Sequence, residues 1–589
     1  MPNHFHFSSY GRTFWLRFVL GIMLVLVTVR LFYIQVIRQD YYAQQARNIQ
    51  VSKLSIVPER GKLYAMDGST PVPFVLNETV YTVFADPKEL EDPAEVLGAV
   101  RAIAGGNVVE TFNESQLKDK KRRYVVIARQ LTRTQAEKLR AKKLAGVGLQ
   151  KGSRRVYPEG ATASQLLGFV NNDGQGQYGI EGALEKQLAG VQGLLQTVTD
   201  VRQIPLTIGE EETSKPAVNG DNIVMSIDRN VQLQAEESLK NGLTKAQATK
   251  GSVVVMDPTT GRVMAMANYP TYNVGEFNKV DDKDIGVFQN GIVSDPYEAG
   301  SVIKVLSMGA GLDSGAVTVN STFNDSTGCT QVDDRKVCNV EEDPKTASAT
   351  MQDTLRYSLN TGVVHVLRQM GGGSVNTKAR QTLYDYYVNR YHFGRATGIE
   401  QAGEAEGIIG GPTQGYGLNV RFANMTFGQG MNVTMIQTAA AFSAAMNGGT
   451  YYKPTVVRGV LQPDGSIREK APEVVGTTMS QASSNTLREL TYQGRHQGFF
   501  GKLDPAGYKV GGKTGTSQVI DARTGAYTNE NSIGSYLGFG GTDTPQYVIM
   551  VRVEDSKLKG GYAGTIAAGP IFNELSNWML NYLELPPRG

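Results

Sequence analysis

The sequence predicts a protein of the mixed α/β (α+β) class, with two folded units behind a single N-terminal transmembrane helix. The chain has 589 residues, more than one hydrophobic core organises, so at least two folded units are expected. A long apolar run lies near the N-terminus, at 18–37. Strand-like segments lie at both ends of the second unit with helical patterns between them, which predicts one sheet assembled from both ends and a helical second lobe.

The apolar run FVLGIMLVLVTVRLFYIQVI, residues 18–37, predicts the transmembrane anchor. At about 1.5 Å per residue it reaches roughly the 30 Å of a bilayer core. Arg30 interrupts it, but an off-centre arginine can extend its head group toward the interface. Bulky residues without a small-residue cleavage site follow, which favours an uncleaved anchor over a signal peptide, with a buried core helix as the alternative. Residues 1–17 are then a short cytoplasmic tail.

The sequence pattern predicts an irregular α+β module at 38–215. Short β-like runs at 80–85 and 124–128 alternate with helical stretches such as Thr134 to Leu144. The basic cluster at 118–123 is predicted to be a solvated face, with a polyanion site as the alternative. The net charge of +3 is too small to imply nucleic acid as a partner.

The sequence pattern predicts a second and larger domain at 216–589. A strand at 220–228 precedes a helical stretch from Asn230 to Leu243. Two strand-like runs then flank the turn sequence at 258–261, which suits a hairpin. Near the C-terminus, two further strands and a helix are predicted at 536–541, 546–555 and 569–582.

The spacing of the two cysteines suggests a disulfide, and the spacing of the histidines does not indicate a metal site. Cys329 and Cys338 lie close together in a stretch suited to a hairpin, and in an oxidising exterior this suggests one local disulfide. Two free thiols are the alternative, because sequence does not give the distance between them. Five scattered histidines lack the paired spacing of a zinc helix, so we expect neither a metal nor a cofactor.

Ser301 and Lys304 are the candidate nucleophile and base. Serine is a poor nucleophile near neutral pH unless a base removes its proton, and with few histidines a lysine is the natural base. A spacing of three residues places both on one face of a helix that begins here, and Gly300 permits a tight entry. Burial among apolar neighbours would lower the pKa of the lysine. The same spacing also occurs by chance at Ser115 and Lys118.

Two further motifs follow in a fixed order. Ser358 and Asn360 form a Ser-x-Asn element, and Lys513-Thr514-Gly515 occurs once, on a strand-like segment. The ordered set of three motifs carries more information than any one of them. Chance copies of Ser-x-Asn occur at 374–376 and 483–485.

This ordered triplet, with other phrases along nearly the whole chain, resembles the class B penicillin-binding proteins. The resemblance implies a penicillin-recognising serine transpeptidase fold, similar to β-lactamases, with a helical second lobe at 216–589. It also implies an elongated α+β N-terminal pedestal, a dimerisation-type domain, at 38–215. The other phrases are Arg60-Gly61, Asp67-Gly68, Arg155 to Pro158, Tyr178 to Glu181, Ser226 to Asp228 with Gln232, and Phe427 to Gly430 with Thr434 and Gln437.

The resemblance also implies roles for the first two motifs. Ser301 would attack the carbonyl of the penultimate D-alanine of a stem peptide, and Lys304 would accept its proton. Ser358 and Asn360 would relay that proton and orient the donor peptide. The plain alternative for Asn360 is that it caps a helix.

The third motif is the implied substrate and β-lactam site. It comprises Lys513, Thr514, Gly515 and Thr516. Lys513 and Thr514 would hold the terminal carboxylate, and the backbone N–H groups of Ser301 and Thr516 would form the oxyanion hole. The plain alternative for Thr514 is that it only fills a strand.

The implied function is a peptidoglycan D,D-transpeptidase that cross-links stem peptides, on lipid-linked or nascent glycan, and that β-lactams inhibit by acylation. The chain would be a single-pass cell-membrane protein with its catalytic domain on the extracytoplasmic side. Since no segment before residue 215 resembles a glycan polymerase, a separate membrane glycan polymerase and division proteins are the implied partners.

The sequence leaves three alternative functions. A β-lactamase needs a water-activating carboxylate, and the sequence assigns none. A β-lactam sensor or scaffold without turnover is disfavoured by the complete triplet, and residues 1–17 would have to serve as the effector of a sensor. An elongation-type transpeptidase is the nearest alternative, because the preference for the septal division type rests on the segments 124–131 and 155–158 alone.

Overall fold

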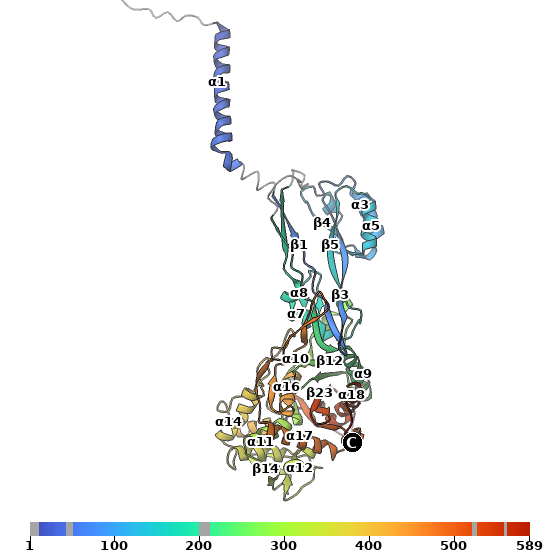
Figure 1. The fold of residues 1–589 in the computed structure, drawn as a ribbon, viewed down its shortest axis with the longest axis vertical. Helices are drawn as coiled ribbons and strands as arrows, with labels where there is room; N and C mark the ends of the chain where they lie inside the picture. The colour runs from blue at the N-terminus through green and yellow to red at the C-terminus, as the bar shows by residue number, and fades with distance from the viewer. Residues whose placement is uncertain (1–10, 43–50, 199–212, 521–526, 559–561, 589) are drawn as a thin grey trace, which may run out of the picture. The chain divides into compact units, whose positions relative to one another are not determined.

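The computed structural model describes residues 11–42, 51–198, 213–520, 527–558 and 562–588 (Figure 1). The chain divides into two compact units, one of Met1–Glu59 with Gly190–Asn219 and the other of Arg60–Ala189 with Gly220–Gly589. Both contain strands and helices, and the predicted mixed α/β class is confirmed. The domain limits at 17/18, 37/38 and 215/216 stay predictions.

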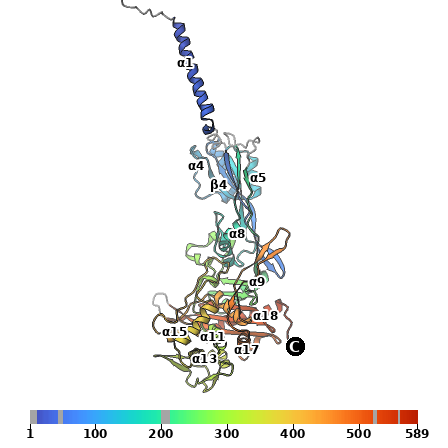
Figure 2. The same ribbon diagram turned by 60° about the vertical axis from the view of Figure 1, so that its left-hand side comes forward.

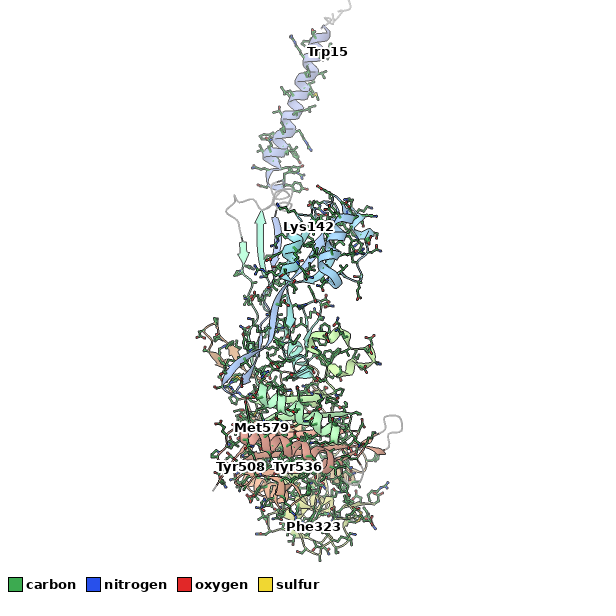
Figure 3. The ribbon with its side chains drawn as sticks, turned by 90° about the vertical axis from the view of Figure 1, so that its right-hand side faces the viewer. Trp15, Lys142, Phe323, Tyr508, Tyr536 and Met579 are labelled. Carbon is green, nitrogen blue, oxygen red and sulfur yellow. A yellow bond between two sulfur atoms is a disulfide. The ribbon has the colours of Figure 1, made fainter. Side chains whose placement is uncertain are left out.

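The first unit contains the apolar helix. Helix α1 (Arg12–Phe32) continues into a π-helical turn (Tyr33–Ile37), and Thr13–Ile37 is long and apolar enough to cross a membrane. It begins before the predicted residue 18, because Phe14 to Leu16 extend the apolar run; Trp15 among them is labelled in Figure 3. The unit also holds an antiparallel sheet of order β1-β8-β9, formed by β1 (Val51–Ile56), β8 (Gly193–Val198) and β9 (Thr213–Lys215).

The second unit begins with a small α/β region around strand β3 (Thr70–Ala85), which pairs with three other strands of a seven-stranded sheet. The strands expected at 80–85 and 124–128 are the end of β3 and the start of β4. The basic side chains of 118–123 are exposed, as predicted for a solvated face. The other strands are β2 (Leu63–Asp67), β4 (Val125–Leu131), β5 (Val147–Val156), β10 (Ile223–Asp228), β18 (Val457–Leu461) and β19 (Ile467–Glu469), and the helices are α3 (Pro93–Ala104), α4 (Ser115–Lys118) and α5 (Arg133–Ala141).

The sheet predicted from the two ends of the second domain is present. It is antiparallel with five strands in the order β12-β11-β23-β22-β21, so the hairpin β11–β12 pairs with the C-terminal strand β23. The predicted turn at 258–261 joins the first two strands, and the predicted terminal helix is α18. The bounds are β11 (Lys250–Met256), β12 (Val263–Tyr269), β21 (Lys509–Ile520), β22 (Tyr527–Gly541), β23 (Pro545–Glu554) and α18 (Gly569–Tyr582).

Helices cover both faces of this sheet, and that explains why its central strands are apolar without alternation. In β11, Val253 and Val255 pack in one core with α9 (Arg229–Lys245) and α18, whereas Val254 and Met256 belong to the other core. Figure 1 shows β23 between α18 and α16 (Met435–Met446). Tyr536 and Met579, labelled in Figure 3, are buried in the α9–α18 core.

The second face carries α11 (Ile303–Asp313), α16 and α17 (Gln481–His496), and the helical lobe continues from them (Figure 2). Helix α16 is buried on all sides, as its apolar and small residues predict, and Thr434 with Gln437 caps its start. The other helices of the lobe are α12 (Met351–Arg356), α13 (Asn360–Met370), α14 (Thr377–Tyr384) and α15 (Leu418–Met425).

The lobe also carries the predicted disulfide. Strands β14 (Cys329–Val332) and β15 (Arg335–Cys338) form a hairpin in which Cys329 lies directly opposite Cys338, and the two are bonded. Short elements complete the unit: α6 (Ser164–Leu167), β6 (Phe169–Val170), β7 (Gly176–Gln177), α7 (Gly179–Ala183), α8 (Glu185–Ala189), α10 (Gly291–Ser294), β13 (Thr322–Phe323), β16 (Ala349–Thr350), β17 (Thr450–Tyr452) and β20 (Val474–Thr477).

Candidate active site

Ser301 lies in a 3₁₀ turn (Gly300–Val302) that leads directly into α11. Gly300 has φ +63°, and a Cβ there would lie 2.8 Å from the carbonyl oxygen of Thr516, so only glycine fits. The turn therefore packs directly against strand β21. Among the described residues the Ser301 hydroxyl makes no hydrogen bond, which leaves its oxygen available to a substrate.

Lys304 follows on α11 and is 1% exposed. Its Nζ donates to the hydroxyl of Ser358 at 3.1 Å and also to the Ser358 carbonyl oxygen. Burial lowers the pKa of Lys304 well below its usual range, and the nearby charge of Lys513 lowers it further. The lysine is therefore prepared to act as a neutral amine that accepts a proton.

Ser358 lies in the short connection between α12 and α13. Its φ is +60°, a left-handed conformation that is costly for a residue other than glycine. In this conformation both its hydroxyl and its carbonyl oxygen face Lys304. The backbone at Ser358 is thus strained where its side chain meets the buried lysine.

Asn360 is the first residue of α13, and the N-cap position is taken by Leu359. The Asn360 side chain therefore does not cap the helix. Its amide donates to the carbonyl oxygen of Cys338 at 2.9 Å. The next residue, Thr361, donates from its backbone N–H to the side chain of Asn339 at 3.0 Å. The start of α13 is thus tied to the end of the disulfide hairpin.

The third motif lies on β21. Lys513 is 6% exposed, and its Nζ donates to the carbonyl oxygen and the hydroxyl of Thr514 at 3.2 and 3.3 Å. Burial lowers the pKa of Lys513 to about 8. A Cβ on Gly515 would lie 2.9 Å from the carbonyl oxygen of Ala299, so this strand packs closely on the turn that holds Ser301. The hydroxyl of Thr516 accepts from the backbone N–H of Gly564 at 3.2 Å.

The three motifs are thus brought together around two buried lysines. Lys304 contacts Ser358, its pKa responds to the charge of Lys513, and the turn of Ser301 rests on Thr516. The chance copies lie elsewhere in the fold: Ser115 and Lys118 form α4, the segment 374–376 caps α14, and the segment 483–485 lies in α17.

Two further residues of the site were not found from the sequence. The ring of Phe427 lies 6.0 Å from Lys304 Nζ, and the charge of Asp343 raises the pKa of both Lys304 and Lys513, partly offsetting the effect of burial. Phe427 was recognised only as part of a family phrase, and no sequence signal indicates Asp343. Within the described part of the chain, no group of three or more His, Cys, Asp or Glu residues is placed to hold a metal ion.

Comparisons with known families support the two-part organisation. Residues 251–577 match the penicillin-binding protein transpeptidase domain, and residues 55–225 match the penicillin-binding protein dimerisation domain. Stage V sporulation protein D of Bacillus subtilis is 27% identical over 570 residues, which cover 96% of this chain and 85% of that protein. The probable peptidoglycan D,D-transpeptidase PenA of Neisseria gonorrhoeae is 25% identical, over 98% of this chain and 94% of its own length.

A solved structure shares the fold. Penicillin-binding protein 2X from Streptococcus thermophilus superposes with a TM-score of 0.70 at 23% identity, over 90% of this chain and 80% of that one. The five-stranded sheet, its covering helices and the preceding α/β region are therefore a known arrangement.

Proposed function

This chain belongs to the class B penicillin-binding proteins, peptidoglycan D,D-transpeptidases that combine a dimerisation domain with a transpeptidase domain, and we propose that it works through an acyl-enzyme at Ser301. The observation that carries the proposal is the buried Lys304, whose pKa is lowered and whose amine contacts Ser358. A neutral Lys304, three residues after Ser301, would supply the base that nucleophilic attack by Ser301 requires.

The first half of the reaction forms the acyl-enzyme. Ser301 Oγ attacks the carbonyl carbon of the penultimate D-alanine, and its proton passes to Lys304. The peptide C–N bond breaks, and the leaving D-alanine receives a proton through Lys304 and Ser358. Asn360 orients the donor peptide from the start of α13.

The strand β21 would bind the donor. Lys513 and Thr514 hold its terminal carboxylate, and Gly515 lets the strand approach the turn of Ser301. The backbone N–H groups of Ser301 and Thr516 bind the developing oxyanion, which is the charge that most needs stabilisation in acyl transfer. A β-lactam has the same carbonyl and carboxylate, so it would acylate Ser301 and inhibit the enzyme.

The rate of acylation by a β-lactam should depend on pH through both lysines. It should rise as Lys304 loses its proton, because the neutral amine is the base and its pKa is lowered. It should fall above about pH 8, because Lys513 then loses the charge that holds the carboxylate. In Lys513→Ala the falling limb should vanish and the rising limb move to higher pH, since the charge of Lys513 lowers the pKa of Lys304. A wild-type rate that keeps rising well above pH 8 contradicts these assignments.

Incubation of the full-length protein in detergent with a pentapeptide donor and an amine acceptor tests the function. We expect release of the terminal D-alanine and a cross-linked product in equal amounts. Hydrolysis of the donor without cross-linking, or turnover of a β-lactam, would contradict the proposal, because it would show that water and not an amine resolves the acyl-enzyme.

We further propose a septal role, with the helix Thr13–Ile37 as the anchor and the catalytic domain on the extracytoplasmic side, where peptidoglycan lies. The segments 124–131 and 155–158, which resemble septal members, support this preference. A membrane glycan polymerase and division proteins would be its partners. Depletion should then leave undivided cells, whereas loss of an elongation-type enzyme would round them.

A further inference from the structure

The buried charge of Lys513 poses a problem for the second half of the reaction. Lys304 and Lys513 bond to oxygen atoms of Ser358 and Thr514, and in the part of the chain that the structure describes neither has an ion pair with a carboxylate. The acceptor is an amine, which is protonated and positive in water at neutral pH. The positive charge of Lys513 would repel it.

Asp343 is a carboxylate whose charge acts on both lysines. It lies in the segment 339–348, which follows the disulfide hairpin, and it is half-buried there. One carboxylate oxygen accepts from the backbone N–H of Val340 at 3.2 Å, which fixes the side chain over its own turn. Burial raises the pKa of Asp343, and the charges of Lys304 and Lys513 partly offset that rise.

The segment that carries Asp343 is attached on both sides of the site. At its start, Asn339 accepts from the backbone N–H and the hydroxyl of Thr361, next to Asn360. Beside Asp343, the carboxylate of Glu342 accepts from the hydroxyl of Tyr562 at 3.3 Å, and Tyr562 follows strand β23. The segment is thus attached to the start of α13 and to Tyr562, two residues before Gly564, whose N–H donates to Thr516.

We propose that Asp343 attracts the ammonium group of the acceptor to the acyl-enzyme and so selects a cationic amine over water. This rests on the proposed function, which supplies the acyl-enzyme at Ser301. The anchoring of the segment on both sides supports it, because a carboxylate held at a fixed place can recruit a cation without ordering a flexible loop.

The bound ammonium first releases one proton to solvent and becomes a neutral amine beside Asp343. Its nitrogen attacks the ester carbonyl at Ser301, and its second proton passes to Lys304. The ester C–O bond breaks, Lys304 returns that proton to Ser301 Oγ, and an amide remains. One proton is released overall, and Asp343 ends as it began, as a carboxylate.

The test compares two acceptors on the full-length protein, with a thioester donor that ends in a carboxylate. D-Alaninamide carries an ammonium group and no carboxylate, whereas hydroxylamine is uncharged at neutral pH. In Asp343→Asn, the concentration of D-alaninamide needed for half-maximal aminolysis should rise about tenfold, as for the loss of one charge interaction near a partly exposed site. The value for hydroxylamine should change far less. Asp343→Glu should restore much of the preference for the acceptor that carries an ammonium group.

Glu341→Gln is the matched control, because it removes the same charge from an exposed residue of the same segment. It should leave the half-maximal concentrations of both acceptors unchanged. In the wild type, raised salt should increase the half-maximal concentration of D-alaninamide and leave that of hydroxylamine unchanged, which tests the inference even if Asp343→Asn fails to fold.

If Asp343→Asn changes the half-maximal concentrations of both acceptors equally, or changes neither, the inference is overturned. The proposed acyl-enzyme at Ser301 would be unaffected by that result. Faster acylation with unchanged aminolysis would also overturn it, because Asp343 would then be occupying the carboxylate site of Lys513. A wild type that forms no acyl-enzyme contradicts the proposed function itself, so the two failures are distinguishable.

Discussion

Ser301→Ala should abolish covalent labelling by a β-lactam and leave the fold intact. The variant loses only the oxygen that would form the ester. The turn should persist, because its close approach to β21 depends on Gly300 and not on the Ser301 side chain. Gel fluorescence with a labelled penicillin measures the adduct, and circular dichroism checks the fold.

Ser115→Ala is the matched control for this variant. Ser115 has the same spacing to Lys118 that Ser301 has to Lys304, but it lies on α4 in the small α/β region. Its substitution should leave labelling unchanged. Labelling that persists in a folded Ser301→Ala protein would move the nucleophile elsewhere.

Lys304→Ala should slow acylation by roughly a hundredfold or more, as for the loss of a general base. Lys304 is 1% exposed, so alanine would also leave a cavity beneath Ser358. Lys304→Met keeps most of the side-chain volume and should slow acylation to a similar extent. Stopped-flow measurement of the second-order acylation constant, with the melting temperature of each variant, separates the two effects.

Lys118, a lysine outside the site, provides the matched control for Lys304. Lys118→Met changes the lysine of the chance motif, which is exposed, and should leave the acylation constant unchanged. If Lys304→Met acylated at the wild-type rate, another group would have to remove the proton from Ser301, and the role of Lys304 would be lost.

Periodic and apolar segments of the fold were predictable from the sequence. The helix at 569–582 has the predicted limits, and the hairpin and C-terminal strands form the predicted sheet, because continuous apolar runs between turns specify strands covered on both faces. The disulfide was predictable because Cys329 and Cys338 flank a short hairpin, where pairing depends on local geometry. The helix begins at Arg12, ahead of the apolar run at 18–37, because Phe14 to Leu16 extend the apolar segment.

Contacts between distant segments were not predictable. The phrases at Arg60, Arg155 and Glu181 indicated a family, and the structure shows why those residue types occur together: both arginines form ion pairs with the fully buried Glu181. Likewise, Asn360 could be identified as a candidate site residue from the sequence, but its contact with Cys338 could not. Such pairs depend on the tertiary fold, which brings together residues that share no local pattern.

The electrostatics of the site were predictable in part. Apolar neighbours of Lys304 indicated that burial would lower its pKa, and the structure agrees. The opposing charge of Asp343 depends on how an irregular, polar segment folds back over the site, and polar segments without periodicity give no indication of where they lie.

Mass analysis of the full-length protein after reaction with a penicillin tests the acyl-enzyme most directly. We expect one adduct per chain with the full mass of the drug, and proteolytic mapping should place it on the peptide that contains Ser301 and Lys304. An adduct on the peptide that contains Ser115, or no adduct on a folded protein, would contradict the assignment of Ser301 as the nucleophile.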